Sequence, residues 1–104
     1  MTKEHSIQND IRNNTADIAM IFRGNVGKGK TYDGRHFDTG LPKGFSDLFG
    51  FRFSDGRMVF IEAKQPGEEP TEDQEKFIEK MRSYGAIAGV AHSAEEAREL
   101  IQGG

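Results

Sequence analysis

Two apolar runs flank a short polar segment, Ser54-Asp55-Gly56-Arg57, near the middle of the chain, and this pattern restricts the fold more than any other. The runs cover residues 47–53 and 58–64. An Asp-Gly pair between apolar runs is a strong signal for a β-hairpin. We therefore predict two neighbouring antiparallel strands.

The predicted hairpin gathers three charged residues on one face. If Asp55 and Gly56 are the two central turn residues, Asp47 lies opposite Lys64, and Glu62 is the diagonal neighbour of Asp47. Side chains alternate along a strand, so Asp47, Glu62 and Lys64 share a face. Diagonal neighbours are about 7–8 Å apart between Cα atoms, close enough for both carboxylates to reach one ion.

The remaining hairpin residues are apolar on both faces. We expect four phenylalanines to pack in the core rather than to form a base-stacking platform: Phe49, Phe51, Phe53 and Phe60. The opposite face carries Leu48, Val59 and Ile61. A sheet with two apolar faces is covered on both sides, as in an α/β sandwich.

The N-terminal segments predict a helix and then a strand. Residues from Lys3 to about Thr15 place Ile7 and Ile11 at helical spacing, with Glu4 on the same stripe. The short, partly β-branched run at 18–22 is typical of a buried strand.

The C-terminal third predicts a helix, a strand and a second helix. Thr71 and Gln74 form a capping box before a helical face that carries Phe77, Ile78, Met81 and Tyr84, and Gly85 ends this helix. Residues 86–91 suit a short strand, and Ser93 with Glu96 caps the last helix. The element order is αβββαβα. With 104 residues, we expect a single domain spanning 1–104.

A long glycine-rich segment, 24–44, separates the first two predicted strands. We expect a loop, and a loop of this length in a small domain is usually functional or disordered. From Arg23 to Lys43 there are five basic residues and two acidic ones. Lys28, Lys30 and Arg35 could contact nucleic-acid phosphates, although ordinary solvated charge explains the counts equally well.

The same segment contains a phosphate-loop pattern. Residues 24–31, Gly-Asn-Val-Gly-Lys-Gly-Lys-Thr, match G-x-x-x-x-G-K-[ST] and follow a predicted strand, so a nucleotide-binding protein is one alternative. That motif requires a helix to begin at the lysine. The next residues show no helical period, so we expect no nucleotide cofactor.

Composition excludes several classes of site. The chain has no cysteine, so disulfides, thiolate zinc sites and cysteine nucleophiles are excluded. His5, His36 and His92 lack metal-ligand spacing, and we expect them to be structural or at the surface. No apolar stretch resembles a signal core or a membrane span, so we expect a soluble cytoplasmic protein.

The chemistry of the hairpin residues suggests a metal site. Two carboxylates and a lysine at a buried hairpin end need each other or a cation to offset their desolvation. Hard oxygen ligands suit Mg²⁺ or Mn²⁺, which can bind a phosphate and activate a water. A surface ion pair explains the spacing of Asp47, Glu62 and Lys64 equally well.

The identities of the residues are more specific than the spacing of the charged groups. The sequence resembles the VRR-NUC (virus-type replication-repair nuclease) branch of the PD-(D/E)xK nucleases in four segments along nearly the whole chain. These are Lys43-Gly44-Phe45-Ser46-Asp47-Leu48, Val59-Phe60-Ile61-Glu62-Ala63-Lys64, Gln74 with Phe77-Ile78, and Gly85 with Ala88-Gly89-Val90-Ala91. One departure is Ser46, where the family signature often has proline.

The resemblance implies a fold and a set of roles. The fold is α/β, a PD-(D/E)xK-like αβββαβα domain with a central mixed sheet flanked by helices. Asp47 and Glu62 would bind Mg²⁺ or Mn²⁺ with help from the Ala63 carbonyl, and Lys64 would assist catalysis. Gln74 and Glu4 would support the site.

The resemblance also implies a metal-dependent DNA endonuclease acting on branched or Holliday-junction-like DNA. The family's relatives include phage-encoded forms that act as dimers, and one small domain covers little duplex, so we expect a homodimer. If the chain is phage-encoded, we expect it in the host cytoplasm. The alternative is a non-catalytic DNA-binding or repair-accessory module on the same fold.

Overall fold

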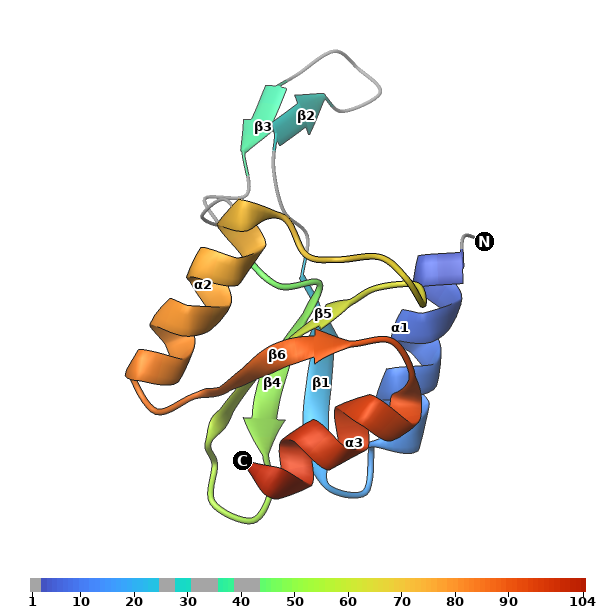
Figure 1. Ribbon diagram of the computed structural model, residues 1–104, viewed down its shortest axis with the longest axis vertical. Coiled ribbons are helices and arrows are strands. Elements are labelled where there is room, and N and C mark those ends of the chain that lie inside the picture. The colour runs from blue at the N-terminus through green and yellow to red at the C-terminus, as the bar shows by residue number, and fades with distance from the viewer. Residues whose placement is uncertain (1–2, 25–27, 31–35, 39–43) are drawn as a thin grey trace.

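The computed structural model describes residues 3–24, 28–30, 36–38 and 44–104. Its elements, shown in Figure 1, are α1 (Lys3–Asn14), β1 (Ala19–Arg23), β2 (Lys28–Lys30), β3 (His36–Asp38), β4 (Leu48–Arg52), β5 (Met58–Ala63), α2 (Glu72–Ser83), β6 (Ile87–Ala91) and α3 (Ala94–Gly103). Apart from the short β2 and β3, their order is the predicted αβββαβα. Within the described residues, no helix combines the length and hydropathy that a bilayer span requires.

The central sheet has the strand order β1-β4-β5-β6. The pairs β1–β4 and β4–β5 are antiparallel, whereas β5–β6 is parallel because α2 forms the crossover between them. The helices α1 and α3 lie on one face of this sheet and α2 on the other (Figure 1). The predicted α/β class and mixed sheet are confirmed.

The two faces of the sheet are covered to different extents. On the α1 and α3 side, Ile11, Leu48, Ile61 and Ile101 are fully buried in one continuous core. On the other side, α2 packs a smaller core over β5 and β6 that includes Phe60, Phe77, Ile78 and Ala88. Among the described residues, no helix covers the β1 and β4 half of that second face (Figure 1).

The predicted core role of the hairpin phenylalanines is therefore only partly correct. Phe60 is buried and Phe49 is half-buried, but Phe51 and Phe53 are 37% and 47% exposed. Alternation correctly placed Phe51 on an apolar face, yet α2 does not reach that part of the sheet. Tyr84 was also expected on the packed side of α2, but it is 78% exposed and lies at the helix C-cap.

The hairpin forms as predicted but in a different register. Leu48 pairs with Ile61 and Phe49 with Phe60, two residues away from the predicted pairing. The N–H of Arg52 donates to the carbonyl of Arg57 at 2.8 Å, so four residues, 53–56, form the loop. The shift is an even number of residues, so every side chain stays on its predicted face.

Local contacts explain why the longer loop forms. The carboxylate of Asp55 accepts hydrogen bonds from the backbone N–H of Arg57 and from the guanidinium of Arg52. Gly56 adopts φ +73°, a conformation that favours glycine. Asp55 therefore stabilises a four-residue loop through its side chain and is not a central residue of a two-residue turn.

Two described parts of the glycine-rich segment form short strands, where a loop was predicted. The strands β2 and β3 pair antiparallel, with Gly29 opposite Phe37, and project away from the rest of the domain (Figure 1). We call this pair the arm. A phosphate loop requires a helix to begin at Lys30, but Lys28–Lys30 form a strand. The backbone at Lys30 therefore does not support the nucleotide-binding alternative.

The helix boundaries follow the predicted signals. Thr71 and Gln74 form a complete capping box at the start of α2, and Gly85, at φ +93°, follows its end. The Ser93 side chain accepts from the N–H of Glu96 at the start of α3.

Each edge of the central sheet receives an arginine from a flanking helix. The Nε of Arg12 in α1 donates to the carbonyl of Ile21 in β1 at 3.3 Å, and the Nε of Arg82 in α2 donates to the carbonyl of Ala88 in β6 at 2.7 Å. Side chains that occupy edge carbonyls hinder pairing with further strands.

Candidate active site

Asp47 and Glu62 lie side by side where β4 begins and β5 ends. The backbone N–H of Asp47 donates to Glu62 Oε2 at 3.3 Å, and the N–H of Ala63 donates to Asp47 Oδ2 at 3.2 Å. Continuing the β4–β5 register by one pair places Asp47 directly opposite Glu62. The predicted diagonal arrangement is therefore wrong, and the two carboxylates are closer neighbours than expected.

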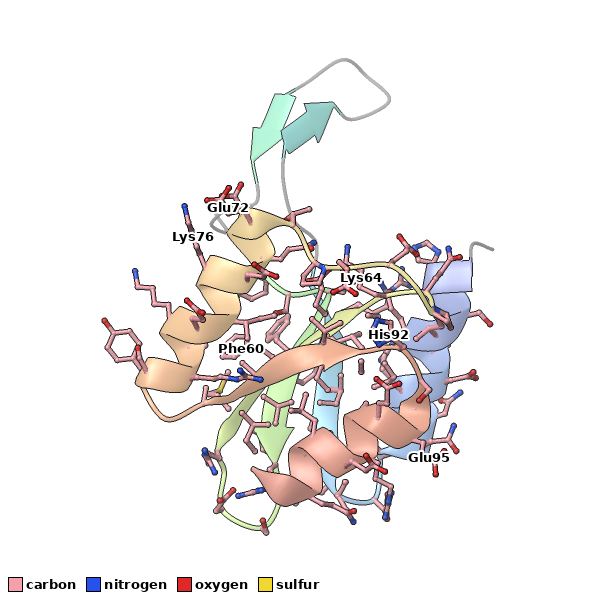
Figure 2. The ribbon with its side chains drawn as sticks, in the orientation of Figure 1. Phe60, Lys64, Glu72, Lys76, His92 and Glu95 are labelled. Carbon is pink, nitrogen blue, oxygen red and sulfur yellow. The ribbon has the colours of Figure 1, made fainter. Side chains whose placement is uncertain are left out.

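Lys64 completes a compact charged group. Its Nζ is 4.0 Å from Glu62 Oε1, and its side chain is 11% exposed. Figure 2 shows Lys64 at the end of the sheet, between α1 and α2. The prediction that Lys64 faces Asp47 directly is wrong because of the register shift, but Lys64 does share the site with both acids.

Burial and repulsion make Glu62 an unusual carboxyl group. The residue is 2% exposed. Burial, followed by the nearby charge of Asp47, raises the pKa of Glu62 to about 8, and the charge of Lys64 offsets only part of this rise. Perturbed carboxyl groups of this kind are frequent at functional sites.

Gln74 links the start of α2 to the carboxylate pair. Its Oε1 accepts from the backbone N–H of Thr71 at 2.8 Å, and its Nε2 donates to Glu62 Oε1 at 2.9 Å. The sequence suggested two functions for this residue, helix capping and support of the site. The structure shows the contacts for both at once.

The base of the arm is also attached to this site. The N–H of Gly24, directly after β1, donates to the carbonyl of Asp47 at 2.6 Å. Gly44 has φ +80°, and a Cβ on it would clash with the backbone carbonyl of Asp73 in α2. No sequence signal predicts these contacts, because they depend on tertiary packing.

Several predicted residues lie outside what the structure describes. The side chains of Glu4, Lys28 and Lys30, and the whole of Arg35, are among them. Their predicted contacts with metal or nucleic acid stay predictions. The backbone of the arm is described at β2 and β3, and it projects from the same end of the sheet as Lys64 (Figures 1 and 2).

The residue before Asp47 contributes packing rather than polar contacts. Ser46 is fully buried, and within the described residues its Oγ has no hydrogen-bond partner. The expectation that position 46 shapes the chain and supplies no ligand stays a prediction.

His92 supports the segment that follows Lys64. Its Nε2 lies 3.1 Å from the carbonyl oxygen of Glu68, and its Nδ1 lies 3.1 Å from Glu96 Oε1. The Glu96 carboxylate, followed by the carbonyl of Glu68, raises the pKa of His92. Because the N–H of Lys64 donates to the carbonyl of Ala91, the imidazole is close to the end of β5 and has the structural role expected for it.

The carboxylate pair lies where the two inner strands, β4 and β5, meet at one end of the sheet. The described cavities include one of about 450 Å³ between α2, β6 and α3 and another of about 440 Å³ beside Phe53 and Ile101. Neither of these two cavities is lined by Asp47, Glu62 or Lys64.

The donor set fits a hard divalent cation. Among the described residues, no group of three or more His, Asp or Glu side chains could hold a metal ion. Mg²⁺ is nevertheless usually bound by one or two carboxylates, with water and phosphate completing its shell. Two adjacent carboxylates, one with a strongly raised pKa, are a site where a cation would relieve the repulsion.

Comparisons with known proteins agree on one domain type. The sequence model for the VRR-NUC domain matches residues 33–95, which include Asp47, Glu62, Lys64 and Gln74. A solved structure described as a VRR_NUC domain is similar to this chain with a TM-score of 0.68 and 23% identity, covering 98% of this chain and 97% of that one. A search of curated proteins found no match.

Proposed function

The chain belongs to the VRR-NUC domain family, a family of nuclease domains, and from this premise we propose that it is a metal-dependent DNA endonuclease. The observation that carries the proposal is the contact between Asp47 and Glu62 at the end of the two inner strands, with Lys64 Nζ 4.0 Å from Glu62. The presence of both acids and the lysine in this chain argues against the non-catalytic alternative.

In the proposed site, Asp47 and Glu62 would hold Mg²⁺ or Mn²⁺, and the carbonyl of Ala63 would supply a further oxygen. Such an ion, when bound, would polarise the scissile phosphate and lower the pKa of a bound water. The backbone N–H groups of Asp47 and Ala63 hold the two carboxylates in place, since they donate to Glu62 Oε2 at 3.3 Å and to Asp47 Oδ2 at 3.2 Å.

Lys64 and Gln74 have separate tasks. The ammonium of Lys64 orients the attacking water or stabilises the negative charge that develops on the phosphate. The amide of Gln74 orients Glu62 through its 2.9 Å hydrogen bond. Glu4, on the first helix, is proposed as a further supporting acid.

The substrate proposed is DNA, because the segment 24–44 contains Lys28, Lys30 and Arg35, and its first residue, Gly24, donates its N–H to the carbonyl of Asp47. Basic side chains on such an arm would contact phosphates on either side of the scissile bond. We propose a homodimer acting on branched DNA, because two linked sites suit a substrate with two strands to cut.

A cleavage assay tests this function. Linear, flapped and four-way DNA are each incubated with Mg²⁺, Mn²⁺ or EDTA, using wild type, Glu62→Ala, Lys64→Ala and the control Glu79→Ala on the exposed side of α2. We expect metal-dependent cutting by wild type and by the control only. Binding without cutting by wild type would instead favour the accessory-module alternative.

A further inference from the structure

The lysine and arginine side chains of the described residues differ in whether an acid accompanies them. Those with nitrogen atoms within 4.0 Å of a carboxylate are Arg52, Lys64, Lys76 and Arg98. Arg57, directly before β5, and Arg82, in the last turn of α2, form no such ion pair within the described part of the chain. The charge of these two arginines is therefore available to an anionic ligand.

Backbone carbonyls of one short segment hold both arginines in place. The Nε of Arg57 donates to the carbonyl of Gly85 at 2.6 Å, and the Nε of Arg82 donates to the carbonyl of Ala88 at 2.7 Å. Three residues of extended chain span at most about 10 Å, so the two guanidinium groups lie near each other. A guanidinium has further N–H donors besides Nε. Those donors remain for a ligand.

Both arginines line one cavity of about 450 Å³ between the C-terminal end of α2, the edge strand β6 and α3 (Figure 1). Gly89 on β6 leaves room for Arg82, because a Cβ at this position would lie 3.3 Å from its Nη2. Glu99 of α3 is also in the lining, but it forms no ion pair with either arginine among the described residues. Two guanidinium groups held in this way suit a phosphate, whose oxygens accept from the planar fork of donors.

A second cavity, of about 280 Å³, adjoins the first and carries an aromatic side chain. The two cavities share Arg57 and Ala86 in their linings. Tyr84 lines the second cavity and is 78% exposed. The turn that carries it is fixed, because the N–H groups of Tyr84 and Ala86 both donate to the carbonyl of Met81, at 3.1 and 3.0 Å. An exposed ring on a fixed turn is a platform on which a nucleobase can stack.

We propose that Arg57, Arg82 and Tyr84 form a binding site for single-stranded DNA, which we call the turn site. The two arginines bind one backbone phosphate, and the tyrosine ring stacks on the neighbouring base. Charge complementarity supports this occupant, since two cations without acidic partners lie beside an exposed aromatic ring. Bases in a duplex are stacked on each other, so only an unpaired base reaches such a ring.

The turn site lies away from the proposed active site and rests on the proposed function, because it assigns one part of the DNA substrate to this surface. Gln74, in the first turn of α2, contacts Glu62, whereas Tyr84 is the C-cap of the same helix. A helix of 12 residues is about 18 Å long. The turn site therefore holds a part of the substrate that is not being cut, and it favours DNA with an unpaired strand.

Fluorescence anisotropy with a labelled oligothymidine in EDTA tests the turn site without cleavage. The proteins are wild type, the double variant Arg57→Gln/Arg82→Gln, Tyr84→Leu and the control Arg12→Gln. Arg12 is a matched control because its Nε also donates to an edge carbonyl, that of Ile21. Among the described residues, no second arginine lines the cavity beside it.

The two kinds of variant should differ in their response to salt. We expect the double variant to bind about 10-fold more weakly than wild type, with the slope of log K against log salt smaller by about 0.7, the value for one phosphate contact on a single strand. Tyr84→Leu should also bind about 10-fold more weakly but keep the slope of wild type, because stacking releases no counterion. Equal binding by all four proteins would overturn the proposal, as would an equal loss of duplex binding in Tyr84→Leu.

Two measurements on wild type cover the case in which a variant fails to fold. Photocrosslinking to an oligonucleotide that contains iododeoxyuridine should give an adduct at Tyr84, and adducts confined to other residues would refute the stacking. In a nuclear magnetic resonance titration, oligothymidine should shift the N–H signals of Gly85 and Gly89. If inorganic phosphate shifts them and oligothymidine does not, the cavity is a site for free phosphate and the DNA proposal is wrong.

The turn site and the proposed function fail in different ways. If oligothymidine binds through Tyr84 in EDTA and no DNA is cut with metal, only the proposed function is wrong. If wild type cuts DNA in a metal-dependent way and the turn-site variants bind oligothymidine as wild type does, only the turn site is wrong.

Discussion

Replacing Glu62 with glutamine is expected to make the metal-free protein more stable at pH 8, even though it removes a proposed metal ligand. The pKa of Glu62 rises from 4.5 to about 8 on folding, chiefly because of burial. Between pH 4.5 and pH 8, Glu62 therefore keeps its proton in the folded state and releases it in the unfolded state. The protonated carboxyl group makes its full contribution to the free energy of unfolding below pH 4.5, and this contribution is lost as the pH rises towards 8.

The magnitude follows from the same pKa. Each tenfold change in proton affinity corresponds to about 1.4 kcal/mol, so ionising Glu62 costs about 5 kcal/mol of unfolding free energy by pH 8. Glutamine keeps an oxygen for Gln74 but loses the attraction to Lys64, so we expect a net gain of about 2–4 kcal/mol at pH 8. At pH 5 the two proteins should differ little.

Urea unfolding in EDTA at pH 5, 6, 7 and 8 measures this difference. The chain has no tryptophan, so circular dichroism is the suitable signal, and a fixed protein concentration removes the effect of dimerisation. Glu79→Gln, on the exposed side of α2, is the control and should follow wild type. The reasoning is refuted if wild type is as stable at pH 8 as at pH 5 and Glu62→Gln gains nothing.

Five further substitutions, two of them controls, test the surroundings of the site. Gln74→Leu should weaken Mg²⁺ binding about 10-fold, because it removes the hydrogen bond to Glu62. Thr71→Ala removes only the cap of α2, so it should cost about 1 kcal/mol of stability and leave metal binding intact. Isothermal titration with Mg²⁺ separates these two outcomes. Lys64→Ala should lower single-turnover cleavage by about 10² or more, with DNA binding little changed in a gel-shift assay. Gly44→Ala should destabilise the fold by more than Gly67→Ala in urea titrations, since both have positive φ but only Gly44 has a backbone carbonyl in the way of a Cβ. Equal losses for the two glycines would contradict that reading.

The sequence predicted the main elements because their signals are local. The capping box at Thr71, the stop at Gly85 and the alternation around the hairpin each depend on a few neighbouring residues. The predicted hairpin register was wrong because an Asp-Gly pair occurs both in two-residue loops and in longer ones. Only the contacts of Asp55 with Arg52 and Arg57 decide between them.

The remaining differences depend on tertiary arrangement. Phe51 lies on an apolar face, and alternation cannot tell which half of that face a helix covers. The short strands β2 and β3 are too rich in glycine to be predicted from residue preferences. Asp47, Glu62 and Lys64 stay on their predicted face because the register shift is even, and Gln74 contacts Glu62 from the start of α2. Their catalytic roles stay predictions.

The amide of Gln74 can point in only one direction. Its oxygen is committed to the N–H of Thr71, so its nitrogen must face Glu62, and a nitrogen can only donate. Rotating the amide to accept a proton from Glu62 would break the cap of α2. The first turn of α2 thereby favours an acceptor, not a donor, at Glu62 Oε1, which is the state in which this oxygen would bind the proposed cation.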